Sequence, residues 1–400
     1  MDRLAYLLLW GLVFTMPWTD MAMFDSFGTI SRIIGMPAFA MCMMSTLAKG
    51  QWRFHAAHFV ALAFVALAGI SYFWSIDTEA TVMKIITYAQ LLLLFWVIFQ
   101  SADTVIRVEN LLGAFVLGAG VAAGFTLYSY AQGVELAYQR YSAGDMNPND
   151  LAYALVMAIP MAWYLRLRQT RDWLTWVGNL YVPLGLFAVF LTASRGGAVV
   201  AFMVLSYIVL RFDDLKRTEK ILFPLVASIM IVMMVANLPQ TAIARIATIG
   251  SELTAGDMNS RSTIWSAGLQ IVNQHWFLGA GSGSFEAGVT KYLGYAIAPH
   301  NAYIAILAEN GVVGLLLFLG IVLIVGMVIW RLPRGERYLW GLLLLTWGIA
   351  SFVSNWEWRK ETWVLFGMAL AHAAAVTAVP GRRHLHGLGT HMREGLCERM

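Results

Sequence analysis

Residues 311–330 read GVVGLLLFLGIVLIVGMVIW, a run of twenty residues without an ionisable side chain. Coiled as a helix, such a run extends about 30 Å, which is the thickness of the hydrocarbon core of a bilayer. Similar apolar runs of about 17 to 25 residues recur from one end of the chain to the other. The sequence therefore predicts an integral membrane protein built from helices.

The composition of the whole chain agrees with this prediction. Of the 400 residues, 59% are hydrophobic and only 12% are charged, whereas soluble domains carry about 25% charged residues. A soluble globular protein is thereby excluded. The first apolar run follows Asp2 and Arg3 and has no small-residue cleavage site after it, so a retained helix is predicted and not a signal peptide.

Hydropathy and helix breakers together predict about twelve membrane spans. Because lipid cannot satisfy exposed backbone groups, each span is expected to be a helix, and the helices to pack as a bundle. The fold class predicted is an all-α polytopic membrane protein, with 1–400 forming a single transmembrane domain. The spans are centred near Val13, Ala38, Phe64, Leu92, Gly120, Met157, Phe187, Leu205, Ile229, Phe318, Leu344 and Leu370.

The charges of the connecting segments alternate, and this alternation predicts the orientation. Lys and Arg gather on the cytoplasmic side of membrane proteins. One side receives Arg3, Lys49, Arg53, Arg107, Arg166, Arg168, Arg171, the segments 211–220 and 331–337, and the basic tail 380–400. Both termini are therefore predicted to be cytoplasmic. The outer side receives the longest connection, 239–300, which is predicted to contain amphipathic helices.

A few basic residues nevertheless lie on the outer side, and two of them fall within apolar runs. Arg32 and Lys84 are near the outer ends of their predicted spans, and Arg140 lies in an outer loop. Ionisable groups inside a membrane usually face a polar cavity or a partner. Arg32 and Lys84 either line such a site, where they would contact an anionic ligand, or extend to the lipid headgroups.

The sequence Ser194, Arg195, Gly196, Gly197 places a guanidinium at the end of a span. Arginine suits bidentate contact with phosphate or pyrophosphate. The two glycines would let the backbone approach a ligand closely. The alternative is an ordinary tight link between two helices, in which Arg195 serves only at a helix end.

Arg261 precedes an amphipathic pattern that begins at Ile264 and Trp265. This spacing predicts a helix on the membrane surface or across the mouth of the bundle, with Arg261 in its first turn. A phosphate could bind there to both the arginine and the free backbone amides; the alternative is a solvated side chain. The glycines between 279 and 283 lack the lysine of a phosphate-binding loop, so a flexible lid or turn is expected there.

His300 ends the long outer segment and stands directly before an apolar run. A neutral imidazole can take a proton from a hydroxyl near neutral pH; the alternative is a histidine with a structural hydrogen bond at the start of a helix. Asn301 could cap the following helix or orient a substrate, and Tyr303 follows on the same helix. Glu309, two turns further on, is expected to have a structural role and to pair with a basic residue or a backbone amide in the bundle. No metal site is expected, because no His, Cys or Asp cluster has metal-ligand spacing, and nucleic-acid binding has no support.

Taken together, these residues resemble the O-antigen ligase and polymerase family of bacterial envelope glycosyltransferases, and most closely its lipopolysaccharide ligases. The layout is also similar, with about twelve spans and the largest outer loop between the ninth and tenth. The resemblance rests on Asn147, Pro148 and Asn149, on Ser194, Arg195 and Gly196, on Arg261 ahead of Trp265, and on Gly281 to Phe285 leading to His300, Asn301, Tyr303, Glu309 and Gly311.

The resemblance implies a GT-C-like enzyme of the bacterial inner membrane with a periplasmic active site. Its donor would be a glycan on undecaprenyl diphosphate, and its acceptor lipid A carrying core oligosaccharide. By position, Arg195 and Arg261 match the essential arginines of the family and His300 its essential histidine. Lys84 sits where many members carry a basic residue.

The residues themselves suggest a mechanism that needs no metal or other cofactor. His300 would deprotonate an acceptor hydroxyl while Arg195 and Arg261 neutralise the departing pyrophosphate, and a single displacement would invert the anomeric centre. Secondary contacts to substrate are assigned to Lys84, Arg32, Arg140, Asn301 and Tyr303. A polymerase or a protein O-oligosaccharyltransferase would use the same chemistry, whereas a polysaccharide or lipid transporter would use Arg32 and Lys84 to line a path.

Overall fold

The computed structural model describes the chain except for residues 22, 25–27, 137–139, 169–171, 249–260 and 379–400. The described part is almost wholly helical. Its long elements are α1 (Asp2–Thr15), α2 (Ile30–Lys49), α3 (Ala56–Ile70), α4 (Thr78–Ser101), α5 (Val105–Ala131), α6 (Pro148–Arg168), α7 (Asp172–Leu191), α8 (Arg195–Leu210), α9 (Arg217–Asn237), α14 (Ala302–Trp330), α15 (Arg334–Val353) and α16 (Lys360–Ala378).

Shorter elements complete the described chain. Three helices, α10 (Gln240–Ala247), α12 (Arg261–His275) and α13 (Phe285–Leu293), lie within the predicted outer segment 239–300. The strands β1 (Met23–Phe24) and β2 (Gly28–Thr29) form a two-residue antiparallel ribbon. The 3₁₀ helices are η1 (Met16–Met21), η2 (Ser71–Phe73), η3 (Phe212–Asp214) and η5 (Trp356–Trp358).

The predicted fold class, an all-α polytopic membrane protein, is confirmed. Each of the twelve predicted span centres lies in a separate helix. Among the described helices, nine are long and apolar enough to cross a membrane: α1 together with η1, α2, α3 together with η2, α4, α5, α6, α7, α14 and α16. The helix α8 is apolar but has 16 residues, and α9 and α15 are not among the nine. The number twelve therefore stays a prediction.

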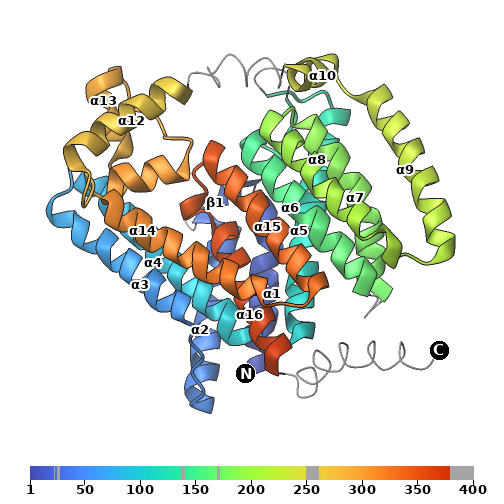
Figure 1. Ribbon diagram of the computed structural model, residues 1–400, viewed down its shortest axis with the longest axis horizontal. Coiled ribbons are helices and arrows are strands. Elements are labelled where there is room, and N and C mark those ends of the chain that lie inside the picture. The colour runs from blue at the N-terminus through green and yellow to red at the C-terminus, as the bar shows by residue number, and fades with distance from the viewer. Residues whose placement is uncertain (22, 25–27, 137–139, 169–171, 249–260, 379–400) are drawn as a thin grey trace, which may run out of the picture.

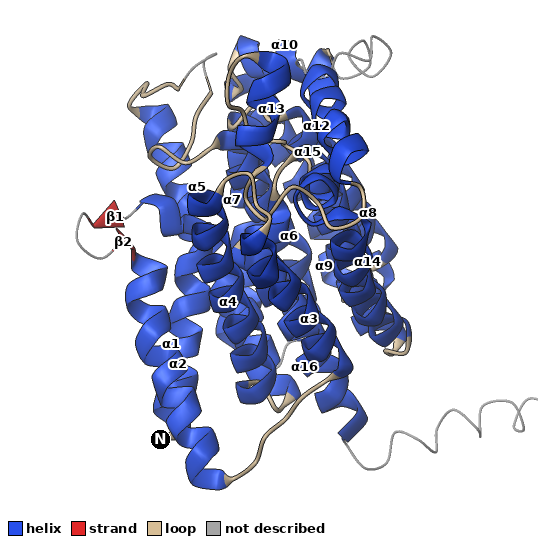
Figure 2. Cartoon of the chain, turned by 90° about the vertical axis from the view of Figure 1, so that its left-hand side faces the viewer, coloured by secondary structure: helices blue, strands red, loops and turns tan. Residues whose placement is uncertain are grey.

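The long helices run side by side as a bundle (Figures 1 and 2). The N-terminus and the end of α16 lie at the bottom in Figure 1, whereas α10, α12 and α13 lie at the top. The N-terminus and the last described helix therefore end on the same side of the bundle, and the side of the membrane that they face stays a prediction. The predicted basic tail, 380–400, falls outside the described residues.

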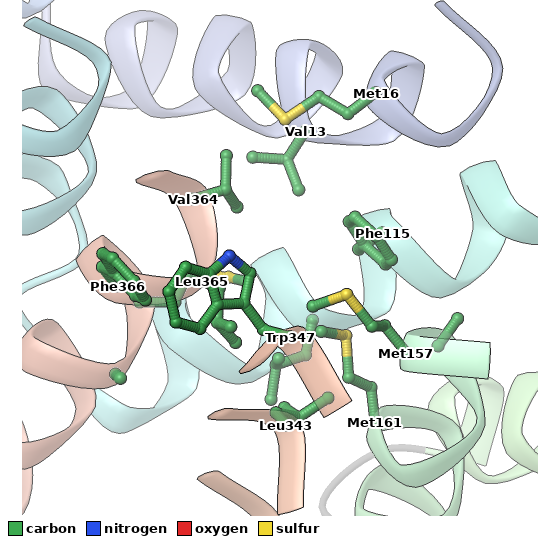
Figure 3. Close-up of a cluster of buried hydrophobic side chains, with 14 of the residues drawn as sticks. Val13, Met16, Phe115, Met157, Met161, Leu343, Trp347, Val364, Leu365 and Phe366 are labelled. Atoms are coloured by element: carbon green, nitrogen blue, oxygen red, sulfur yellow. The ribbon is translucent and has the colours of Figure 1, made fainter. Parts of the chain in front are cut away.

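The core of the bundle lies around α6, in which 16 of 21 residues are buried. The backbones of α6 and α7 approach closely at Gly178, where an added Cβ would lie 2.5 Å from the carbonyl oxygen of Ala162. Small residues allow such contacts between membrane helices. Figure 3 shows side chains from α1, η1, α5, α6, α15 and α16 meeting in this core: Val13, Met16, Phe115, Met157, Met161, Leu343, Trp347, Val364, Leu365 and Phe366.

The helix α14 is broken at Gly311, whose φ of 66° and ψ of −170° are not helical. The break frees backbone groups inside the bundle, and the segment 276–281 satisfies them. The amides of Ala280 and Gly281 donate to the carbonyls of Ala308 and Glu309 at 2.9 Å each. In return, the amides of residues 312 and 313 donate to the carbonyls of residues 276 and 277, at 2.9 and 3.3 Å. A broken membrane helix persists where protein satisfies its backbone in this way.

Of the two expectations for residues 279–283, a flexible lid or a turn, residues 282 and 283 form a turn. Hydrogen bonds fix this segment, so it is not a flexible lid. Besides its pairing with α14, this segment is held by the amide of Ser282, which donates to Ser71 at 3.0 Å. The hydroxyl of Thr81 on α4 donates to the carbonyl of Ser282 at 2.7 Å. The glycines serve backbone packing, since a Cβ at Gly279 would lie 2.3 Å from the backbone of Glu309.

Candidate active site

Four arginines and one histidine gather at the end of the bundle that carries α10 and α12. The charge of Arg140 interacts with those of Arg195 and Arg245. Arg195 in turn interacts with Arg261, and Arg261 with His300. The structure thus brings together the three residues predicted to be catalytic, and adds Arg140 from the predicted secondary contacts. Arg245 on α10 was not predicted.

The start of α8 holds Arg195 in a tightly braced turn. Ser194 caps the helix by accepting from the amide of Gly197 at 3.2 Å, which agrees with the alternative of a tight interhelical link. The residue before it, Ala193, has a φ of 47°, a left-handed conformation that costs energy for a non-glycine residue. The Nε atom of Arg245 donates a hydrogen bond to the carbonyl of Ala193 at 3.3 Å.

Arg140 braces the same turn from the loop before α6. Its Nε atom donates to the carbonyl of Thr192 at 2.8 Å, and its Nη2 atom to the side chain of Asn149 at 2.8 Å. Burial and the charges of Arg245 and Arg195 together lower the pKa of Arg140 to about 10. Arginines that repel one another in this way favour the binding of an anion between them.

The expected role of Gly196 and Gly197 in ligand approach is not what the structure shows. A Cβ at Gly196 would lie 2.0 Å from the hydroxyl of Tyr153, and one at Gly197 would lie 2.6 Å from the Cβ of Ala152. Both glycines therefore face α6, and they allow α8 to pack closely against it. The helix start that carries Arg195 is positioned by this contact.

Arg261 is the first described residue of α12, in the first turn as predicted. Burial lowers its pKa, and this effect is opposed by the charges of Tyr153 and Asp150. The helix packs through Ile264 and Ile271 against α13 and α14. Trp265 fixes α12 to the segment before α14, because its Nε1 atom donates to the carbonyl of Pro299 at 3.1 Å.

His300 adopts the same unusual backbone conformation as Ala193, with a φ of 47°. Each of these residues stands directly before the cap of a helix. Asn301 caps α14 by accepting from the amides of Tyr303 and Ile304, both at 3.0 Å. Strained residues cluster at active sites, where the surrounding contacts hold them in place.

Burial and charge both favour the neutral imidazole of His300. Burial lowers its pKa, the charge of Arg261 lowers it further, and Asp150 partly offsets these effects. The imidazole is therefore neutral at pH 7 and has a nitrogen free of a proton. That is the form a general base requires.

Asp150 connects the candidate site to the segment just before α16 through hydrogen bonds and an ion pair. The sequence did not indicate this role. Its carboxylate accepts from Ser354 at 2.6 Å and from the indole of Trp356 at 3.3 Å, and pairs with Arg359. Arg359 also pairs with Asp20 at 3.3 Å. These partners are more than 100 residues away from Asp150 in the chain. The one feature of the sequence that could have indicated a role for Asp150 is its position directly after Asn147, Pro148 and Asn149.

Lys84 lies in a separate ion-pair cluster at the break in α14. Its ammonium is 3.3 Å from Glu357 and 3.6 Å from Glu309, which confirms the expected pairing of Glu309 with a basic residue. The interactions described for Lys84 are with Glu309, Glu357, Tyr88 and Trp358, and do not include the arginines of the site. Its predicted contact with substrate stays a prediction.

The other predicted contacts also have positions in the structure. Arg32 is exposed at the start of α2, and its charge interacts with Lys360. The hydroxyl of Tyr303 donates to the carbonyl of Gly348 at 3.3 Å, and its ring packs on Phe352. Asn301 is buried and serves as the helix cap, the first of its two predicted roles.

The chemistry of the site follows from these positions. Four guanidinium groups form a cationic cluster beside a neutral imidazole. Asp150 is an acidic neighbour of Arg261 and His300. Such a cationic cluster can bind a phosphorylated leaving group while the imidazole removes a proton. Among the described residues, no group of three or more His, Cys, Asp or Glu side chains could hold a metal ion.

Comparison with known proteins adds one match. Residues 180–319 match the family model described as O-antigen ligase. The matched segment runs from α7 into α14 and contains Arg195, Arg245, Arg261 and His300. A comparison with curated proteins finds no match.

Proposed function

We propose that the protein transfers a glycan from undecaprenyl diphosphate to an acceptor. The match over residues 180–319 supports its membership in the O-antigen ligase family. At the coarse level the match supports an enzyme of the O-antigen ligase or polymerase type that acts on lipid-linked glycans within a membrane. The finer proposal is an O-antigen ligase whose acceptor is lipid A with core oligosaccharide.

The observation that carries this proposal is the juxtaposition of arginines with a neutral histidine. A glycan on a lipid diphosphate leaves behind a pyrophosphate group, whose charge must be compensated as the glycosidic bond breaks. Arg195, Arg261 and the neighbouring arginines would supply this compensation without a metal ion. Arg32 and Lys84 remain proposed as outlying contacts to the substrates.

The proposed reaction is a single displacement. His300 takes the proton of an acceptor hydroxyl, and the oxygen forms a new bond to the anomeric carbon of the donor. The bond between that carbon and the pyrophosphate oxygen breaks, and its electron pair stays with the undecaprenyl diphosphate. One displacement inverts the configuration at the anomeric carbon.

The location follows from the same proposal. The site would face the periplasm, at the outer side of the bacterial inner membrane, with both termini in the cytoplasm. The positive charges of the opposite connections, 211–220 and 331–337 among them, support this orientation.

A second candidate is a polymerase, or a protein O-oligosaccharyltransferase, with the same donor chemistry. Deletion of the gene separates these functions. Loss of long polysaccharide from lipid A, with accumulation of long lipid-linked polymer, is expected for the ligase. Single repeats attached to lipid A would instead indicate the polymerase, and unchanged lipopolysaccharide with loss of protein glycosylation would indicate the protein-directed enzyme.

Reconstitution tests the transfer reaction itself. The purified protein is expected to move glycan from undecaprenyl diphosphate to lipid A-core in detergent, without a gradient and in the presence of EDTA. Transfer in detergent would exclude a transporter as the explanation. Loss of activity in EDTA that a divalent cation restores would contradict the metal-independent mechanism.

A further inference from the structure

A polar cavity is lined by residues at the start of α1 and at the end of α2. In Figure 2 the N-terminus lies at the bottom of the bundle, whereas α10, α12 and α13 lie at its top. The cavity is formed where the ends of α1, α2, α4 and α5 meet, and its volume is about 60 Å³. One water molecule needs about 10–15 Å³ in the same measure. The cavity therefore has room for a group of several heavy atoms. The charged and amide residues that line it are Asp2, Lys49, Gln51, Arg53, Gln100, Asp103 and Arg107.

The charges that line this cavity do not balance. Lys49 pairs with Asp2, and Arg107 pairs with Asp103 at 3.0 Å. Arg53 is the additional cation. It is half-buried, and among the described residues no carboxylate lies within the 4.0 Å that defines an ion pair with it.

The polar contacts of Arg53 are neutral groups. Its Nη1 atom donates to the carbonyl of Phe99 at 3.1 Å, and its guanidinium lies 4.8 Å from the centre of the Phe99 ring. Burial lowers the pKa of Arg53, and the charge of Asp103 opposes this effect. A half-buried guanidinium without a close carboxylate favours binding of an external anion.

Exposed apolar side chains next to the cavity place it at the level of lipid headgroups. Trp52 and Phe54, on either side of Arg53 in the chain, are 45% and 52% exposed, and their rings stack with centroids 6.3 Å apart. Aromatic rings at the ends of membrane helices lie among the headgroups. On α2, Met44 and Leu47 are also exposed and offer apolar surface to acyl chains.

We propose that this cavity binds the phosphate of an anionic phospholipid, with Arg53 as the main charge partner and its acyl chains along α2. The planar guanidinium matches two phosphate oxygens at once. Such a lipid would hold together the ends of α1, α2, α4 and α5. This site lies at the far end of the bundle from His300 and is independent of the proposed glycan transfer.

Native mass spectrometry of the full-length protein, titrated with phosphatidylglycerol in neutral detergent, tests the proposal. The wild-type protein is expected to bind the lipid saturably, and Arg53→Gln to weaken this binding about tenfold or more, as the loss of a charged hydrogen bond predicts. The control is Arg3→Gln, which removes one charge from an exposed side chain on the adjoining α1. It is expected to change the affinity by less than about twofold.

Three results would overturn the proposal. Equal losses of lipid affinity in Arg53→Gln and Arg3→Gln would mean that the lipid is attracted by the overall positive charge of this surface and not by a specific site. Inorganic phosphate that competes as strongly as the lipid at equal concentration would mean a free anion as the ligand. If Arg53→Gln does not fold, Arg53→Lys keeps the charge but loses the planar fork, and undiminished lipid binding by that variant would refute the proposed contact of the guanidinium with two phosphate oxygens.

Discussion

At the scale of single residues, the site depends on the charge state of His300. Its imidazole lies beside Arg261 and Asp150, and the residue adopts a left-handed backbone conformation held by the cap at Asn301. The proposed base must be neutral to accept a proton. In the proposed mechanism, burial, the charge of Arg261 and the opposing charge of Asp150 therefore set the pH below which transfer falls.

The pH dependence of transfer follows from this environment. Because the pKa of His300 lies below its usual value of about 6.5, kcat/KM is expected to be flat near pH 7 and to fall as the pH drops through the lowered pKa. Asp150→Asn removes the charge that raises this pKa, so the acid limb should move to lower pH. A limb that stays in place, or moves to higher pH, would contradict the assignment of His300 as the base.

Arg245 offers a second test, because the sequence did not indicate it. Its charge interacts with Arg140 and Arg195. Arg245→Gln is expected to lower the rate of transfer about 100-fold, the lower end of the range for one lost transition-state donor. Lys291→Gln, which alters an exposed cation on α13, is the matched control and should retain nearly full activity. Equal activities of the two variants in a purified assay would exclude Arg245 from the site.

At the scale of elements, the break in α14 is the place where the outer segment 239–300 forms backbone hydrogen bonds with a long helix of the bundle. Residues 276–281 satisfy the freed backbone groups of α14, while Lys84 from α4 pairs with Glu309 beside the break. The ring of Trp358 lies 5.6 Å from Lys84 and 5.3 Å from Arg359. Through Arg359, this cluster is linked to Asp150 and so to the candidate active site.

A substitution at Gly311 tests the importance of the break. Gly311→Ala would place a Cβ 2.1 Å from the carbonyl oxygen of Phe277, at a position where φ is 66°. The clash and the left-handed backbone together should reduce stability by about 2 kcal/mol or more. Gly341→Ala on α15, where no atom lies within 4 Å of the added Cβ, is the control. Thermal unfolding in detergent should separate the two variants; equal midpoints would mean that α14 does not depend on the glycine.

At the scale of the whole molecule, the sequence predicted the membrane helices well because hydropathy is a local property. The run 311–330 lies within α14, and every predicted span centre falls in a helix. The break at Gly311 was missed because it depends on hydrogen bonds to residues 276–281, which are about 30 positions away in the sequence. Hydropathy cannot report such pairing.

The candidate site was predictable from the sequence only where its residues stand at the start of a helix. Arg195, Arg261 and His300 stand at recognisable helix starts, and the structure brings them together with Arg140. Asp150, Tyr153 and Arg245 were missed because their importance arises from packing between distant segments. The same limit explains Gly196, whose role is to accommodate Tyr153 and not a ligand.

The most direct test of the central claim compares the wild-type protein with His300→Gln in a purified assay that measures donor binding and glycan transfer separately. Glutamine keeps a polar side chain of similar reach but cannot act as a base. The variant is expected to bind the undecaprenyl diphosphate-linked donor with nearly wild-type affinity and to transfer its glycan at least about 100-fold more slowly. Transfer by His300→Gln at the wild-type rate would contradict the account.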